Sequence, residues 1–111
     1  MAMVALCLPI LPGKKAKWQE MADNFSHEPM KSQLDASRKA AGVHERTFLQ
    51  ETPHGDMVIV TLEGDKPHEA FSKMMADSSM RDFAEWAADV HGIDPNSPPP
   101  PMPRLVYDSN A

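Results

Sequence analysis

Two polar residues near the middle of the chain have the chemistry for a small-molecule site. His44 and Arg46 lie in a run of alternating side chains, and neighbouring residues of a strand point to opposite faces of a sheet. An imidazole exchanges a proton near neutral pH, and a guanidinium holds an anion through parallel hydrogen bonds. Both side chains would reach a ligand if this face met the helices. The alternative, which we favour, is that Arg46 forms an ion pair at the sheet's end with Glu51 or Asp56.

The other titratable residues form no recognisable catalytic or metal-binding pattern. No two histidines have the i, i+4 spacing of a helical metal pair, and no cluster of histidine, cysteine and carboxylate has ligand spacing. We therefore expect no metal and no other cofactor. His91 falls at the end of a predicted helix, where the dipole favours a cationic imidazole. Cys7 lies among apolar residues of a predicted strand, where a thiol is inert.

Aromatic side chains could line an apolar ligand pocket. Most of them recur at the spacing of one helix face, and such residues build the core of a small domain more often than a ligand site. Nine methionines add flexible side chains that fill a core or adapt to an apolar ligand. Both interpretations stay open. The candidate ligand-binding residues are Trp18, Phe48, Phe83 and Trp86.

Length and charge restrict the class of protein. A chain of 111 residues is expected to form one domain, residues 1–111. The net charge of -5 argues against a nucleic-acid or anionic-membrane partner, because both need a basic surface. The apolar segment 1–11 lacks a preceding basic region and is shorter than the ~20 residues of a membrane span. A single cysteine excludes an internal disulfide and favours a cytoplasmic location.

The elements that must position these residues are strands and helices in a clear order. Residues 43–52 and 57–62 alternate on either side of a turn at 52–56, which predicts a β-hairpin. Residues 3–10 and 57–62 are apolar on both faces, as in central strands. Residues 14–41 have helical periodicity with a break expected at 26–29, where Ser26 would cap the second piece.

The second half is also predicted to contain a strand and a helix, although no internal repeat stands out. Asp65 is a candidate N-cap for a helix that breaks at 77–79 and ends at Gly92. Residues 93–103 hold six of the eleven prolines and are expected to form a stiff crossover, or alternatively a ligand for a proline-recognising domain. Residues 105–107 are predicted to form a short final strand.

This order predicts an α+β fold of the ferredoxin-like type, β-α-β-β-α-β. Its four-stranded antiparallel sheet would carry helices on one face and leave an apolar face uncovered. Exposed apolar patches of that size usually mark an interface. A homodimer packed sheet to sheet would bury about 800 Å² per partner, which is ordinary for a dimer.

The chain resembles the dimeric α+β-barrel superfamily, and within it the small stress-responsive and monooxygenase-like proteins. The resemblance rests on RKAAGV at 38–43, ERTFLQ at 45–50, GDMVIV at 55–60 and SSMRDFAEW at 78–86. It implies a ligand space between the sheet and its helices, or inside the dimer barrel. The superfamily includes cofactor-free monooxygenases, haem-degrading enzymes, muconolactone isomerases, haem peroxidases and members without known activity. Haem degradation is disfavoured because the first strand has no asparagine and Trp86 is too close to His91.

Two functional hypotheses follow, and the sequence does not decide whether the protein is catalytic. One is a cytoplasmic homodimer that binds a small apolar or anionic molecule and acts as a monooxygenase-like or isomerase-like enzyme. The other is a non-catalytic dimeric module that binds a ligand or another protein. The second is favoured by the absence of a convergent acid–base or metal-binding set.

Overall fold

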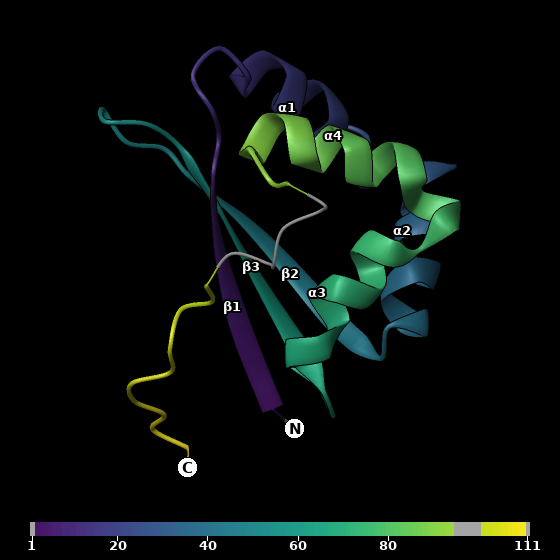
Figure 1. Ribbon diagram of the computed structural model, residues 1–111, viewed down its shortest axis with the longest axis vertical. Coiled ribbons are helices and arrows are strands. Elements are labelled where there is room, and N and C mark those ends of the chain that lie inside the picture. Colours follow the sequence, from purple (N-terminus) through teal and green to yellow (C-terminus); the bar gives the residue numbers. More distant parts are fainter. Residues whose placement is uncertain (1, 95–100, 111) are drawn as a thin grey trace.

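A three-stranded antiparallel sheet and four α-helices make up the fold in the computed structural model, which describes residues 2–94 and 101–110 (Figure 1). A single 3-10 turn, η1 (Ser78–Met80), joins the last two helices. Along the chain the elements are β1 (Ala2–Pro9), α1 (Lys15–Ala22), α2 (Met30–Ala40), β2 (Val43–Gln50), β3 (Met57–Gly64), α3 (Pro67–Ala76) and α4 (Arg81–His91).

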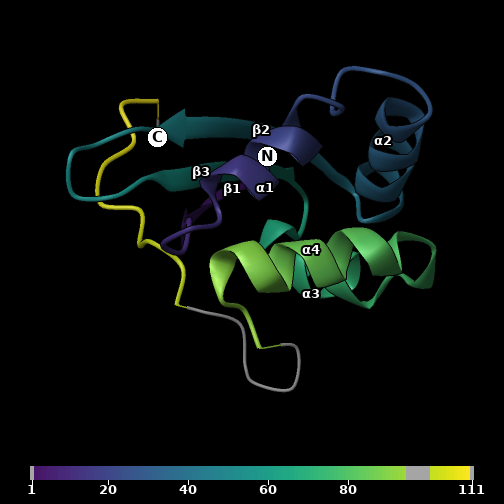
Figure 2. The ribbon, with the colours of Figure 1, turned by 90° about the horizontal axis from the view of Figure 1, so that it is seen from above.

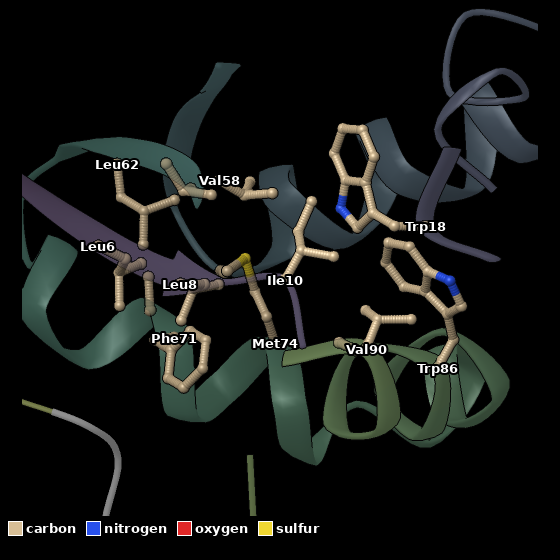
Figure 3. Packing of buried hydrophobic residues seen from close by; sticks show 14 residues of the cluster. Leu6, Leu8, Ile10, Trp18, Val58, Leu62, Phe71, Met74, Trp86 and Val90 are labelled. Atoms are coloured by element: carbon tan, nitrogen blue, oxygen red, sulfur yellow. The ribbon is translucent and has the colours of Figure 1, made fainter. Parts of the chain in front are cut away.

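The sheet has β3 at its centre, as the apolar alternation of this strand predicts. It pairs antiparallel with β1 on one side and β2 on the other, so that Val60 lies opposite both Leu6 and Thr47. Every second residue of β3 is buried against the helices, and on the same face of β1 Leu6 and Leu8 are buried. Figure 3 shows these strand residues packed against side chains of α3 and α4, among them Leu6, Leu8, Val58, Leu62, Phe71, Met74 and Val90.

The prediction of a four-stranded ferredoxin-like sheet is wrong. The described residues follow the order β-α-α-β-β-α-α, and residues 101–110 contain no strand. Leu105, Val106 and Tyr107 are instead 70, 84 and 80% exposed. They have the composition of a strand, but only three such residues follow Pro103, which cannot donate to a ladder. In Figure 1 this segment passes on the β1 side of the sheet without joining it. β1 is therefore an edge strand; most of the proline run, at 95–100, lies outside the described residues.

The expected helix breaks are confirmed, although some of the caps differ. α1 ends at Ala22 and α2 begins directly after Pro29. Ser26 does not cap α2; the carboxylate of Glu28 accepts a hydrogen bond from the Ser32 backbone N–H at 3.0 Å. Asp65 is likewise not a cap, because the cap position of α3 is Lys66. At the second break Asp77 accepts from the Ser79 N–H at 3.0 Å, as the sequence indicates.

A close backbone approach fixes how α2 turns into β2. Gly42 follows α2 with a φ of 75°, a left-handed conformation that favours glycine. Its carbonyl oxygen lies against the end of β3, where a Cβ on Gly64 would overlap it. Glycine at position 64 therefore lets β2 start within pairing distance of β3.

The two faces of the sheet have different surroundings. α3 and α4 lie against one face, and no helix of the described chain covers the other (Figure 2). We call the uncovered side the open sheet face; it presents Met3, Cys7, Phe48, Met57 and Ile59. Cys7 was expected to be buried and inert, but it is exposed here. The expectation was wrong because it assumed that both faces of the first strand were covered.

Candidate functional site

An apolar cavity lies between the sheet and the helices. We call it the inner cavity; its volume is about 70 Å³. Its wall combines strand residues with side chains from α1, α3 and α4, including Leu8, Trp18, Val58, Phe71, Met74 and Trp86. Figure 3 shows the two indoles, one from α1 and one from α4, at the same end of this cluster. A cavity of ~150 Å³ lined by such residues holds benzene, so the inner cavity suits a molecule smaller than an aromatic ring.

Aromatic rings close one end of the inner cavity. Phe25, Phe83 and Trp86 contact one another with ring centroids 5.2 to 6.1 Å apart. The indole N–H of Trp86 donates to the backbone carbonyl of Lys17 at 3.3 Å. Aromatic pairs at such distances stabilise a fold by more than the burial of their apolar area alone. This end of the cavity is therefore preorganised.

A charged pair lies where the inner cavity meets the surface. Arg38 donates from Nε to Oε1 of Glu45 at 2.7 Å, and Thr47 donates from Oγ1 to Oε2 of the same carboxylate at 2.6 Å. The guanidinium also lies 5.2 Å from the ring centroid of Phe83. Arg38, Glu45 and Thr47, which we call the mouth, line both the inner cavity and an open groove beside α2. The inner cavity and the groove therefore adjoin at the mouth.

His91 adds one nitrogen base to the wall of the inner cavity. Its side chain comes from the last turn of α4, and the residue is only 6% exposed. Nδ1 lies 2.8 Å from the carbonyl oxygen of Pro9. A carbonyl only accepts, so Nδ1 carries the proton and Nε2 keeps a free lone pair. Burial lowers the pKa of His91, and the bond to Pro9 offsets part of this effect. The expectation of a cationic imidazole at the helix end was wrong, because burial outweighs the dipole.

The buried histidine predicts how stability depends on pH. Since its pKa is lowered from 6.5 in the fold, the unfolded chain binds more protons as the pH falls below this value. The free energy of unfolding should therefore decrease below about pH 6.5. The carboxyls of Asp56, Asp77 and Asp89 have pKa values lowered from 3.8, so their contribution is lost only in stronger acid. Urea unfolding at about pH 7.5 and about pH 5 measures the difference.

Two variants assign this pH dependence. His91→Asn keeps a donor in the place of Nδ1 and cannot be protonated, so its stability should change less between the two pH values. His54→Gln is the matched control, because His54 lies exposed in the loop between β2 and β3. If His91→Asn loses as much stability in acid as the unmodified protein, another group is responsible.

The candidates predicted on the second strand do not lie at the inner cavity. By strand alternation His44 and Arg46 belong to the open sheet face, and His44 also lines the groove beside α2. Arg46 forms a surface ion pair, as in the alternative interpretation, but its partner is Glu63, with Nη1 and Oε1 3.6 Å apart. The carboxylates expected to pair with it, Glu51 and Asp56, instead contact Lys15 at 3.0 and 2.8 Å.

The aromatic candidates are divided between the two faces. Trp18, Phe83 and Trp86 line the inner cavity, whereas Phe48 lies on the open sheet face and is 53% exposed. Sequence reasoning missed the mouth and His91. One available signal was that Glu45 shares a strand face with Val43 and Leu49, while Arg38 lies about one helical turn before Gly42, the residue that precedes this strand. A carboxylate on an apolar strand face requires a cation nearby.

Comparisons with known proteins assign no family to this chain. No protein-family model matches the sequence, and no curated protein matches it. Within residues 2–94 and 101–110, no three histidine, cysteine or carboxylate side chains gather as a metal site would require. In the same part of the chain, no helix has the length and apolar character needed to span a membrane.

Proposed function

We propose that this protein is a homodimer that binds a small apolar molecule in its inner cavity. The observation that carries the proposal is an apolar cavity with a charged pair at its mouth. A core of this size has few voids larger than a water molecule, because protein interiors are closely packed. Pockets that bind ligands combine an apolar wall with a few placed polar groups. The inner cavity has both, with Glu45 and Arg38 at the mouth and His91 in its wall.

The open sheet face supports the dimer. Phe48, Met3 and Met57 are exposed by 53, 49 and 36% on the same side of the sheet. Around them lie polar side chains, including the ion pair between Arg46 and Glu63. An apolar centre with a polar rim is the usual anatomy of an interface between subunits. A second copy offers the same surface, so the two open sheet faces would pack against each other about a twofold axis.

Binding without catalysis is the form of this function that the side chains support best. The described wall of the inner cavity contains no serine or cysteine nucleophile, and its single neutral base is His91. An isomerase-like proton transfer at His91 is the catalytic alternative. We assign no residue to a monooxygenase-like activity. We also assign none to binding of another kind of protein.

Xenon is the direct probe of the inner cavity, because it enters apolar cavities without needing a hydrogen bond. Under xenon pressure, the methyl NMR signals of Leu8, Val58 and Met74 should shift. Ala87→Leu should abolish these shifts, because Ala87 lines the cavity from α4 and a larger side chain fills the space. Its neighbour Ala88 lies outside the inner cavity, so Ala88→Leu should leave the shifts unchanged.

The outcome of the xenon experiment decides whether the cavity binds a ligand. Shifts confined to residues of the inner cavity, and lost only in Ala87→Leu, support the proposal. If xenon moves no methyl signal in the unmodified protein, the space is closed and the binding function fails. If both variants lose the shifts, the effect comes from a general loosening of α4 instead of from filling the cavity.

A further inference from the structure

The open groove beside α2 is a second space that could hold a ligand. Its volume is about 640 Å³, within the range of pockets that bind small organic molecules. Its apolar wall consists of half-buried side chains, among them Phe25, Leu34, Val43 and Phe83. The ring centroids of Phe25 and Phe83 are 6.1 Å apart. The groove therefore presents an aromatic surface to a molecule that is too large for the inner cavity.

The carboxylates along the groove already have cationic partners. Asp35 pairs with Lys31, with Oδ2 and Nζ 2.6 Å apart. Glu45 pairs with Arg38 at 2.7 Å, as described for the mouth. The charge of Arg38 also acts on Asp77, but Asp77 lines a separate groove between α3 and α4. No carboxylate in the groove is therefore left without a counter-ion.

Three other groups in the groove are still able to donate a hydrogen bond. The ammonium of Lys39 has no hydrogen bond or ion pair in the described part of the chain, and neither has the imidazole of His44. Arg38 donates from Nε to Glu45 and from Nη1 to Ser37, and its Nη2 has no partner among the described residues. All three donors come from the last turn of α2 and the start of β2. The groove thus combines one unpaired positive charge with further N–H groups.

We infer that the groove beside α2 binds a small aromatic monocarboxylate, with its ring on the apolar wall and its carboxylate at Lys39. A carboxylate accepts hydrogen bonds from ammonium, guanidinium and imidazole N–H groups, and charged bonds of this kind are the stronger ones. Aromatic rings pack on one another offset or edge to face, which suits a ligand ring beside Phe25 and Phe83. One negative charge matches the one unpaired cation, whereas a cationic ligand would be repelled by it.

Benzoate and benzamide test the inference, because they have nearly the same shape and differ in charge. At low salt, benzoate should bind to the unmodified protein roughly threefold to fivefold more tightly, the contribution of one exposed ion pair. The net charge of -5 repels benzoate, so a general attraction cannot produce this preference. Methyl NMR signals of Leu34 and Val43 should shift, whereas those of Leu8 and Val58, which line only the inner cavity, should stay in place.

Two lysine variants assign the preference to the groove. Lys39→Met removes the charge and keeps a long side chain that favours a helix, so it should bind benzoate and benzamide equally. Lys73→Met changes the net charge by the same amount on α3, outside the groove, and should keep the preference. In the unmodified protein, raising NaCl from about 0.05 to about 0.5 M should weaken the preference, because salt screens an exposed pair.

A preference for benzoate that Lys39→Met abolishes and Lys73→Met keeps supports the inference. Equal binding of the two molecules to the unmodified protein, or no binding of either, would overturn it. A preference lost in both lysine variants would be an effect of net charge and would overturn it as well. If Lys39→Met does not fold, a preference that salt leaves unchanged in the unmodified protein has the same consequence. The inner cavity is tested separately by xenon, since an aromatic ring is too large for it.

Discussion

Replacement of Phe48 by lysine is expected to convert the proposed homodimer into a monomer. Phe48 is the most exposed large apolar residue of the open sheet face, and its strand neighbour across the sheet is Ile59. A buried aromatic residue at the centre of an interface contributes the most to binding. Its loss should raise the dimer dissociation constant roughly 30-fold or more, and the buried lysine charge adds to this cost. Sedimentation velocity over a range of protein concentrations measures the dimer dissociation constant of the unmodified protein and of the Phe48→Lys variant.

A matched control separates the interface from general effects of apolar surface. Leu105 is 70% exposed but lies in the C-terminal segment, outside the open sheet face. Leu105→Lys therefore makes the same kind of change and should leave the dimer intact. A monomeric unmodified protein at all concentrations would contradict the dimer. Dissociation by Leu105→Lys, with no effect of Phe48→Lys, would move the interface to the C-terminal segment.

The monomer should stay folded after the Phe48 change, which keeps the result interpretable. Phe48 points away from the helices, so it makes no contact with the inner cavity. Lysine at an exposed strand position is tolerated and discourages pairing between copies. The far-ultraviolet circular dichroism spectrum and the xenon response should therefore be unchanged. Loss of the xenon response in this variant would mean that the cavity depends on the dimer.

Local sequence signals predicted most of the elements. Pro29 cannot continue a helix, and α1 and α2 are separate on either side of it. Residues on both sides of the turn at 52–56 alternate, and β2 and β3 form the expected antiparallel pair. These features depend on a few adjacent residues, so they can be recognised without knowledge of the rest of the fold. The apolar pattern predicted that the first and the third strand are both central, which is right for β3 and wrong for β1, an edge strand.

The long-range features could not be predicted with the same certainty. β2 has an apolar residue on each face, Phe48 and Leu49, so its pattern does not show which face meets the helices. The choice depends on whether a partner neutralises Glu45, and that partner, Arg38, lies beyond a turn. The prediction of a final strand was wrong for a related reason. Residues 105–107 have strand composition, but a strand needs a neighbour, and composition alone does not supply one.

His91 shows why the site was harder to predict than the elements. A histidine in the last turn of a helix is ordinarily exposed and favourably placed for a positive charge. Here the end of α4 packs on the end of β1, so the same residue is buried and neutral. The contact joins residues 82 positions apart in the chain. The chemical role of His91 therefore depends on tertiary packing that no local pattern contains.

The mouth is expected to carry the largest stability contribution of any polar group near the site. Arg38 and Glu45 have side chains that are only 13 and 19% exposed. Arg38→Met would leave the Glu45 carboxylate with the Thr47 hydroxyl as its hydrogen-bond donor. Removing one partner of a buried pair leaves the other charge without a counter-ion, so we expect a loss of about 3 kcal/mol in the free energy of unfolding. Urea unfolding near neutral pH measures this value.

Two further variants test whether the stability lost in Arg38→Met comes from the unpaired charge of Glu45. Lys31 lies on the same helix and pairs with Asp35 at 2.6 Å, but both side chains are largely exposed, so Lys31→Met should cause little change. The double variant Arg38→Met with Glu45→Gln removes the charge and should recover part of the stability that Arg38→Met loses. If Arg38→Met is as mild as Lys31→Met, the mouth is open to water and the pair does not seal the cavity. A large loss that Glu45→Gln relieves means that both charges are desolvated at the mouth and that their pairing stabilises the fold.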